Sequence, residues 1–147
     1  MDAVGHTVRA FDASNNQVAE NFFDTRELLE ETTDGAGRVK DWNYDSRGSI
    51  VQFEDGLQHV TNYAYDALVR LTQVTDPLSQ VTGQIFDQDG NRASLINALG
   101  KATTFSFDRG DRITSVTTAS GLATSYSYNA NNTVATRKRD RTTPPVC

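Results

Sequence analysis

The chain has 147 residues, the length of a single domain, of which 37% are hydrophobic and 22% charged. Its net charge of -5 argues against nucleic acid as a general partner. No apolar run approaches the roughly 18 residues of a membrane span, and residues 1–12 lack the apolar segment of a signal peptide. Two histidines and one cysteine exclude an internal disulfide and leave little material for a metal site. We therefore expect no metal, no cofactor and no catalytic residue.

The chain contains an internal repeat of 21 residues. An aromatic residue followed by Asp or Asn recurs at this interval, with the Asp or Asn at positions 24, 45, 66, 87, 108 and 129. A degenerate pair, Phe11-Asp12, lies too close to the first of these to fit the interval. A fixed period of this length predicts one supersecondary unit per repeat. The six regular pairs are Phe23-Asp24, Tyr44-Asp45, Tyr65-Asp66, Phe86-Asp87, Phe107-Asp108 and Tyr128-Asn129.

Each repeat carries a strand pattern before its Asp or Asn. A second column of residues stands three positions before it, occupied by Asn21, Trp42, Tyr63, Gln84, Phe105 and Tyr126. Alternation of strand-forming residues with a period of two places both columns on one face of a strand. We expect a ladder on that face in which Trp42, Tyr63, Phe105 and Tyr126 neighbour each other in order. The repeat-signature residues, all predicted to have a structural role, are Trp42, Tyr44, Asp45, Tyr63, Tyr65, Asp66, Phe86, Asp87, Gly90, Phe105, Phe107, Asp108, Tyr126, Tyr128 and Asn129.

The Asp or Asn of each pair is expected to begin a tight turn. Gly48 follows Asp45 after three residues, and Gly90 follows Asp87 in the same way. This spacing favours a type I turn, because the carboxylate bonds the turn backbone and glycine accepts a positive φ. Val69 fits that fourth position least well. Further turns of the same chemistry are predicted at residues 34–37, 76–79, 97–100 and 118–121.

A second strand is expected after each turn. Apolar residues recur five positions after the Asp or Asn, at Leu29, Ile50, Leu71, Ile113 and Val134. Each unit then reads strand, turn, strand, turn, which predicts an all-β fold: an array of 21-residue antiparallel β-hairpin repeats forming a curved or spiralling sheet. Residues 27–33 have helical propensity, yet Leu29 falls in the second-strand column, so we predict strand there. The predicted organisation is a degenerate or partial repeat at 1–12, six hairpin repeats at 13–138 and a disordered tail at 139–147.

Residues 63–66 (Tyr-Ala-Tyr-Asp) and 70–78 (Arg-Leu-Thr-Gln-Val-Thr-Asp-Pro-Leu) resemble the Rhs/YD-repeat family. The family unit reads roughly G-x-x-T-x-Y-x-Y-D-x-x-G-R-L-T-x-V-x-D-P-x-G, and the resemblance covers residues 13–138. Family members are large secreted or surface proteins of bacteria, insecticidal toxin complexes and animal teneurins. Their repeats form a β-sheet that spirals into a hollow shell, which in bacteria often encloses a C-terminal toxin. The resemblance implies a non-enzymatic segment of shell or scaffold wall in a secreted or cell-surface protein.

Four features could carry chemistry, and each has a simpler structural explanation. Residues 87–91 resemble the start of a calcium loop but lack its sixth-place Gly and twelfth-place Glu, and a hairpin turn explains them. Residues 76–79 lack the Gly of the Asp-Pro-x-Gly cleavage motif found in some family shells, and they fall in a turn column. His6 and His59 have no nucleophile that the sequence places beside them. The basic cluster Arg137-Lys138-Arg139 with Arg141 could contact nucleic acid or anionic lipid, but a solvated tail explains it.

Two further functions remain open at this point. Exposed aromatic rings bind sugar rings, which would make the chain a carbohydrate-binding cell-surface module. Unpaired strands at the ends of the array would recruit flanking repeats or further copies of the chain, giving a self-assembling oligomer or filament. Because the pattern is still running at Tyr128-Asn129, we expect an open apolar edge strand and no self-sufficient monomer. The expected partners are flanking repeats, copies of the chain or glycans, with no nucleic acid and no membrane insertion.

Overall fold

The computed structural model describes residues 5–141, and residues 1–4 and 142–147 lie outside this part of the chain. Within residues 5–141 the chain forms thirteen β-strands and no helix, and the described strand pairs are antiparallel. The predicted all-β fold of antiparallel hairpins is thereby confirmed. The described part of the chain contains no helix long and apolar enough to cross a membrane.

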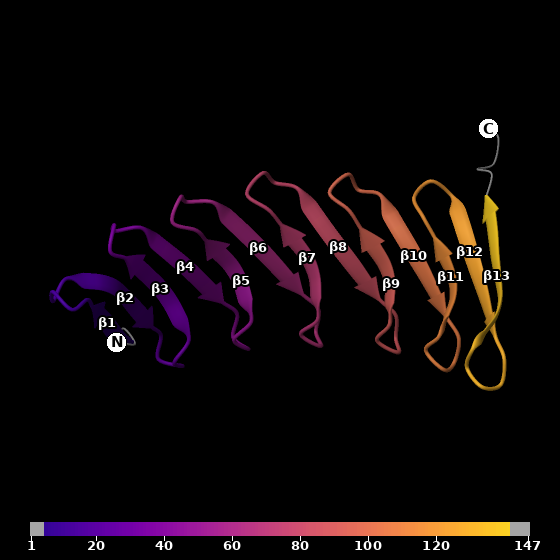
Figure 1. Ribbon diagram of the computed structural model, residues 1–147, viewed down its shortest axis with the longest axis horizontal. Coiled ribbons are helices and arrows are strands. Elements are labelled where there is room, and N and C mark those ends of the chain that lie inside the picture. The colour runs from indigo at the N-terminus through magenta and orange to yellow at the C-terminus, as the bar shows by residue number, and fades with distance from the viewer. Residues whose placement is uncertain (1–4, 142–147) are drawn as a thin grey trace. The chain divides into compact units, whose positions relative to one another are not determined.

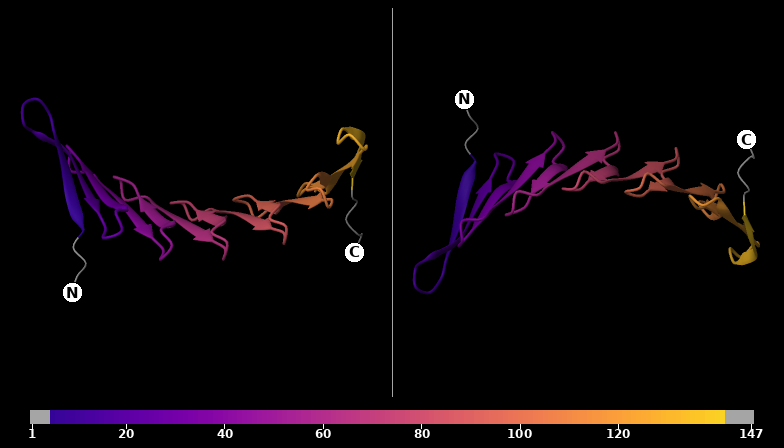
Figure 2. Two further views of the ribbon diagram at one scale, coloured as in Figure 1. Left: turned by 90° about the horizontal axis from the view of Figure 1, so that it is seen from below. Right: turned by 90° about the horizontal axis from the view of Figure 1, so that it is seen from above.

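The strands fall into two compact units, residues 1–79 and 80–147, and within each unit they pair in sequence order (Figure 1). Viewed edge-on, the strands of each unit form a single layer (Figure 2). The first unit contains β1 (His6–Phe11), β2 (Gln17–Phe23), β3 (Leu29–Asp34), β4 (Val39–Tyr44), β5 (Ile50–Glu54), β6 (Val60–Tyr65) and β7 (Leu71–Thr75). The second contains β8 (Val81–Phe86), β9 (Arg92–Ile96), β10 (Ala102–Phe107), β11 (Ile113–Thr117), β12 (Leu122–Tyr128) and β13 (Val134–Arg141).

The hairpin turns share one backbone geometry. In the turn that begins at Asp45, the N–H of Gly48 donates to the Asp45 carbonyl oxygen at 3.1 Å, and the N–H of Asp45 donates to the Ser49 carbonyl oxygen at 2.9 Å. This is a type I turn whose fourth residue has a positive φ, which closes a three-residue hairpin loop. Strands therefore flank Asp45, Asp66, Asp87 and Asp108 with a turn after each, as predicted. The same pair of bonds recurs at turns that begin at residues 12, 24, 34, 55, 66, 87, 97, 108, 118 and 129.

Two of these turns, at Asp12–Asn15 and Asp55–Gln58, were not predicted as turns from the sequence. Consecutive turns of a meander lie at opposite edges of the sheet. The Asp12 turn therefore lies at the same edge as the Asp34 turn, and the Asp24 turn lies at the other edge. The Phe11-Asp12 pair therefore has the residue types of the repeat, but its turn lies at the edge of the sheet opposite to the Asp24 turn.

A β-bulge accompanies each turn that follows an aromatic residue. Tyr44 pairs with Ile50 while Asn43 pairs with Gln52, so Val51 is an extra residue with no partner opposite. The hairpins around the other five regular aromatic pairs show the same shift. Because side chains alternate between faces, an odd period of 21 would send successive ladder residues to opposite faces. The one extra residue at the bulge restores the same face in every repeat.

Val69 occupies the fourth position of the Asp66 turn with a φ of 63°. Left-handed backbone costs a residue other than glycine about 1–2 kcal/mol, and a β-branched side chain fits it least well. We expect Val69→Gly to raise the free energy of unfolding by about 1 kcal/mol in a denaturant melt. Leu68→Gly in the same turn is the control, because its φ is not positive, and it should be neutral or destabilising by about 0.5 kcal/mol. An equal gain from both changes would contradict the strain explanation.

The ladder residues Trp42 and Tyr63 lie on one face of the first unit, but they do not adjoin each other. Trp42 pairs with Phe53, and Phe53 pairs with Thr61, two residues before Tyr63. The predicted neighbour-to-neighbour ladder is therefore wrong, because β5 lies between the two ladder strands and separates them by roughly 10 Å. In the second unit, β11 separates the corresponding residues of β10 and β12 in the same way.

The opposite face of the first unit is polar. The side-chain amide of Asn43 donates to Gln52 Oε1 at 3.0 Å, and the amide of Gln52 donates to Asn62 Oδ1 at 3.0 Å. A ladder of amide hydrogen bonds across β4, β5 and β6 therefore lies behind the aromatic face. One side of the sheet is apolar and the other faces solvent, as is common in antiparallel sheets.

None of the described hydrophobic side chains is fully buried. The least exposed residues are Ser94 and Thr124, at 7% and 9%. The aromatic ladder, Tyr65 included, is half-buried, because in a single layer each ring is covered only by neighbours on its own face. The aromatic side chains of this face are thus partly covered by their neighbours and partly exposed to solvent.

The last strand, β13, extends to Arg141 and so reaches into the predicted disordered tail at 139–147. The prediction of disorder is wrong for the first three residues of that tail. Strand β12 offers seven paired positions to β13, and backbone pairing does not need an apolar pattern in the second strand. Residues 142–147 of the predicted tail lie outside the described residues.

The predicted apolar edge strand at this end is also wrong. The outer strand of the second unit is β13 rather than the aromatic β12, and its residues 137–139 are charged and exposed. Charged side chains on an edge strand oppose uncontrolled pairing with other sheets. The second unit therefore presents a basic edge in place of an aromatic one.

Candidate functional site

The aromatic face of the first unit is built around Trp42 and Phe53. Their ring centroids lie 5.3 Å apart at an interplanar angle of 40°, within the range of favourable aromatic pairs. On the same face, the hydroxyl of Tyr44 donates to the carbonyl oxygen of Leu29 at 2.8 Å, which ties β4 to the preceding hairpin. In the second unit the Tyr128 hydroxyl makes the equivalent bond, 2.7 Å long, to the carbonyl oxygen at the start of β11.

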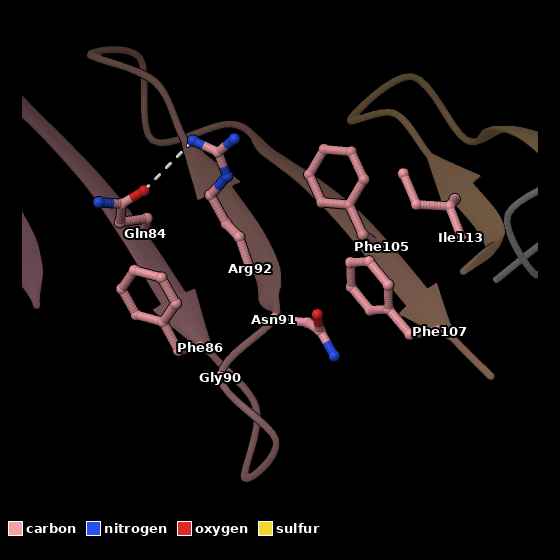
Figure 3. Close-up of a pocket in the computed structure, with 8 residues that line it drawn as sticks. All are labelled: Gln84, Phe86, Gly90, Asn91, Arg92, Phe105, Phe107 and Ile113. Atoms are coloured by element: carbon pink, nitrogen blue, oxygen red, sulfur yellow. Dashed lines mark hydrogen bonds between the residues drawn. The ribbon is translucent and has the colours of Figure 1, made fainter. Parts of the chain in front are cut away.

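The aromatic face of the second unit has a gap where one repeat departs from the pattern. Gln84 stands in the column that holds Trp, Tyr or Phe in four other repeats, and Arg92 stands in a column that is otherwise aliphatic. Their side chains approach each other at 3.4 Å, between Arg92 Nη1 and Gln84 Oε1 (Figure 3). The substitution leaves a groove of about 420 Å³. Its walls are formed by Phe86, Phe105, Phe107 and Ile113 together with Gln84, Gly90, Asn91 and Arg92.

The turn carboxylates at the hairpin ends bind their own backbone. In the Asp66 turn, Oδ1 accepts the N–H of Leu68 at 2.9 Å and the N–H of Arg70 at 3.0 Å, while Oδ2 accepts Arg70 Nε at 2.7 Å. The bond from the Arg70 backbone holds the pKa of Asp66 below its ordinary value, and burial opposes this effect only in part. The pKa of Asp45 is lowered in the same way by the backbone N–H of Ser49.

Neighbouring repeats are joined laterally at their turns. In the first unit, Arg26 Nη1 donates to the carbonyl oxygen of Asp45 at 2.9 Å, and Arg47 Nη1 donates to that of Asp66 at 3.2 Å. In each case an arginine of one turn reaches the backbone of the next turn along the same edge. In the second unit, Asn91 binds Asp111 at 2.7 Å and Arg112 binds Asn132 at 2.6 Å. Within each unit, side chains at the sheet edge thus fasten these hairpins to their successors.

We expect the free energy of unfolding to fall as the pH drops below about 4. The turn carboxylates have lowered pKa values in the folded chain, so the stability they contribute is complete above the unfolded value of about 3.9 and is lost as the pH falls through the folded values. Urea midpoints between neutral and acidic pH would measure this loss. Asp45→Asn keeps an oxygen acceptor in the turn but removes its titration, so its acid loss should be smaller. An unchanged acid loss in this variant would contradict the assignment.

The Tyr44 hydroxyl should contribute about 1 kcal/mol to stability, because Tyr44→Phe removes its bond and leaves the Leu29 carbonyl without that donor. Denaturant melts would measure the difference. Tyr126→Phe is the matched control, because no hydrogen bond of the Tyr126 hydroxyl is found among the described residues. Equal losses from the two changes would contradict the role of this bond.

The dependence of stability on alkaline pH gives a second test of the role of the Tyr44 hydroxyl. Burial, followed by the charges of Asp24 and Glu30, raises the pKa of Tyr44. The stability from this shift is complete below the ordinary tyrosine pKa of about 10 and is lost as the pH rises through the raised value. The wild-type chain should therefore lose more stability at high pH than Tyr44→Phe loses.

The features that the sequence singled out for possible chemistry are each explained by local structure. His6 stacks on Phe23 at 5.0 Å, and His59 Nδ1 lies 3.0 Å from Asp55 Oδ2 within a turn. Residues 87–91 form a hairpin turn, in which Asp87 Oδ1 accepts the backbone N–H of residue 91 at 2.8 Å. Within residues 5–141 no group of three or more His, Cys, Asp or Glu is placed to hold a metal ion.

The signature residues predicted from the sequence occupy two zones. The aromatic members lie on one face of each unit, and the Asp, Asn and Gly members form the turns at one edge. The sequence singled out Asn91 only as part of the loop at 87–91, and it did not single out Arg92 or the lateral arginines as site residues. Arg92 could have been found as a departure from an aliphatic column. The arginine contacts span two repeats, and no pattern within one repeat reveals them.

Three comparisons place the chain among known proteins. A family model described as the teneurin YD-shell matches residues 34–143. Comparison with curated proteins gives no match. Solved structures share the fold: the TcdB2-TccC3-Cdc42 crystal structure is 16% identical with a TM-score of 0.61, covering 95% of this chain and 9% of that one. The Photorhabdus luminescens Tc holotoxin pore is 14% identical with a TM-score of 0.56, covering 97% of this chain and 8% of that one.

The chain therefore spans less than a tenth of the length of each of these solved structures. At such identities the likeness concerns the fold alone. It agrees with the repeat of strand, turn and bulge described above and with the resemblance to YD-repeat proteins. Because the family model extends over well more than half of the residues, the chain belongs to the teneurin YD-shell family.

Proposed function

We propose that this chain is a segment of wall in the shell of a longer YD-repeat protein and has no catalytic activity of its own. The lateral bonds between turns carry this proposal. Arg26 and Arg47 each reach the backbone of the following turn, so neighbouring hairpins are fixed to one another at the sheet edge as well as along their strands. Within a unit, such bonds oppose the sliding of one hairpin past the next, as a wall requires.

The wider role follows from the family and belongs to the same proposal. The wall would pair with flanking repeats of its parent chain and would enclose a cargo, in bacteria a toxin. A secreted or cell-surface location is part of the proposal. The signature residues would serve this function structurally: the aromatic members by covering one face, and the Asp, Asn and Gly members by closing the turns.

Cryo-electron microscopy of the natural full-length protein tests the proposal. The expected result is a hollow shell in whose wall the 21-residue hairpins of this chain follow one another. Hairpins folded as a separate module away from any enclosed volume would contradict it.

Carbohydrate binding is a second candidate function, and one observation favours it. The groove in the second unit combines half-exposed rings of Phe105 and Phe107 with the polar groups of Gln84, Asn91 and Arg92. Flat rings beside hydrogen-bonding groups suit sugar rings. A glycan array should then show binding that Phe105→Ala abolishes and that Phe11→Ala, on an exposed ring outside the groove, leaves intact. An array without signal would rule this function out.

A further inference from the structure

The groove on the aromatic face of the second unit contains a positive charge without a counter-charge. Arg92 lies on β9, between the strands that carry Phe86 and Phe105, and its side chain is exposed (Figure 3). Its Nη1 lies 3.4 Å from the neutral amide oxygen of Gln84. Among the described residues, no carboxylate lies within ion-pair distance of this guanidinium. The groove therefore has one cation that is available to a ligand.

This charge results from the displacement of an arginine by one position. In the turns that begin at Asp66 and Asp108, an arginine four residues later binds the carboxylate of that aspartate at 2.7 Å. In the turn beside the groove that position is occupied by Asn91, and the arginine follows it. Arg92 pairs across the hairpin with Phe86, so it stands on the aromatic face and not among the turn carboxylates. The column that it occupies is otherwise aliphatic.

The same repeat also lacks one ring. In the first unit, Trp42 lies opposite Phe53, with their ring centroids 5.3 Å apart. Gln84 takes the place of that tryptophan and lies opposite Leu95. Leu95 is 37% exposed, whereas Phe53 and Val116 in the same column are half-buried. Apolar surface is therefore left uncovered where the ring is missing.

We propose that this groove is a docking site for a partner polypeptide that places an aromatic side chain next to an acidic one. The ring would fill the gap beside Gln84 and cover the rings of Phe86 and Phe105, while the carboxylate would pair with Arg92. Interfaces are commonly anchored by a few large side chains that fill such gaps, and a charge beside the gap makes the contact specific. The groove of about 420 Å³ has the size of a binding pocket, for which about 300–1,000 Å³ is usual.

Three other occupants fit the groove less well. A small molecule would be covered on one side only, because the strands of the unit form a single layer, whereas pockets for small molecules cover about 70–90% of their ligand. A nucleic acid strand needs a row of cations along its phosphates, and the residues that line the groove include a single cation, Arg92. A neutral sugar would contact the rings but leave that charge unpaired.

Docking at the groove is independent of the wall function. Microscopy can place the chain in a shell whether or not a peptide binds the groove, and peptide binding can be measured on the chain alone. Docking is an alternative to carbohydrate binding at the same groove. A glycan signal without peptide binding would favour the carbohydrate function and overturn the docking proposal.

Titration of the isotope-labelled 147-residue chain with blocked hexapeptides, followed by NMR, tests the proposal. The first peptide is Gly-Ser-Trp-Glu-Ser-Gly. The second replaces glutamate with glutamine, and the third replaces tryptophan with alanine. We expect the first to bind about two- to fivefold more tightly than the second, because an exposed ion pair contributes little. It should bind at least about tenfold more tightly than the third, which lacks the anchoring ring.

Variants locate the two contacts. Arg92→Gln should bring the ratio between the affinities of the first two peptides close to one, because the carboxylate loses its partner. Arg109→Gln removes the same charge from an exposed turn of the same unit and should leave that ratio unchanged. Gln84→Phe restores the ring of the column and fills the gap, so it should weaken binding of the first peptide at least about tenfold. An unchanged strand signal in circular dichroism would show that the variants are folded.

Several results would overturn the proposal. Equal affinity of the unmodified chain for the first two peptides would remove the role of Arg92. Binding that survives Gln84→Phe, or chemical shift changes spread over both units, would place the contact outside the groove. A single-stranded oligonucleotide that shifts the groove residues more strongly than the peptides would assign the site to nucleic acid. No binding of any peptide would leave the gap as a variation in packing.

Discussion

Replacing Trp42 with alanine is expected to lower the free energy of unfolding by about 2.5–4.5 kcal/mol. An aromatic side chain buries roughly 150–250 Å² when it is covered, at about 25 cal/mol per Å². Trp42 is half-buried, which reduces this contribution, while its contact with Phe53 adds about 0.5–1.5 kcal/mol. Denaturant melts followed by circular dichroism would give the difference.

The matched control for this change is Phe11→Ala, because Phe11 is 53% exposed and has no place in the aromatic ladder. It should cost less than about 1 kcal/mol. A loss near zero for Trp42→Ala would mean that the aromatic face does little to hold the sheet together. That result would favour the carbohydrate-binding function over the wall.

Deleting one whole repeat should leave a folded, cooperative chain. Removal of residues 46–66 joins Asp45 directly to residue 67 and rebuilds a turn of the same kind, with the following strand in its proper phase. Since in the described part of each unit a strand contacts only the strands next to it, the array should close up around the loss. The denaturant m-value should fall by roughly one-seventh, in proportion to the surface removed.

Deleting a single strand is the contrasting experiment. Removal of residues 46–56 also leaves Asp45 before a possible turn, but β6 then takes the place of β5. The column of Tyr63 and Tyr65 would move to the polar face, because a strand of the wrong parity exposes its apolar side. We expect this variant to unfold or aggregate. Equal stability of the two deletions would contradict the structural meaning of the 21-residue period.

The sequence was sufficient to predict the hairpin array, because its strongest signals are local. A turn that begins with Asp or Asn and ends on a residue with positive φ can be recognised from four consecutive residues of the sequence. The prediction of strand at Leu29 succeeded because its column in the repeat outweighed the helical propensity of its neighbours. Most strands and turns could therefore be predicted without a structure, whereas the turns that begin at Asp12 and Asp55 were missed.

Features that depend on pairing between strands could not be predicted from the sequence. The bulge at Val51 cannot be seen in one strand, because it is defined by the residues opposite. The neighbour relation between Trp42 and Tyr63 was misjudged for the same reason, since Phe53 lies between their strands. The order in β13 came from the partner that β12 provides and not from an apolar pattern of its own. The groove could not be predicted from a single repeat, because its lining residues come from two adjacent hairpins.

The lateral bonds between hairpins end on main-chain oxygens in the first unit. Arg26 and Arg47 bind the carbonyl oxygens of the following turns, and Tyr44 binds that of Leu29. Every amino acid supplies such an oxygen, so these contacts place no demand on the identity of the neighbouring side chain. A gene could therefore gain, lose or exchange the repeats of this first unit by unequal recombination, without the compensating mutations that side-chain contacts such as those of the second unit would require. Evolution can in this way change the length of the array and the sequence of its repeats independently of each other.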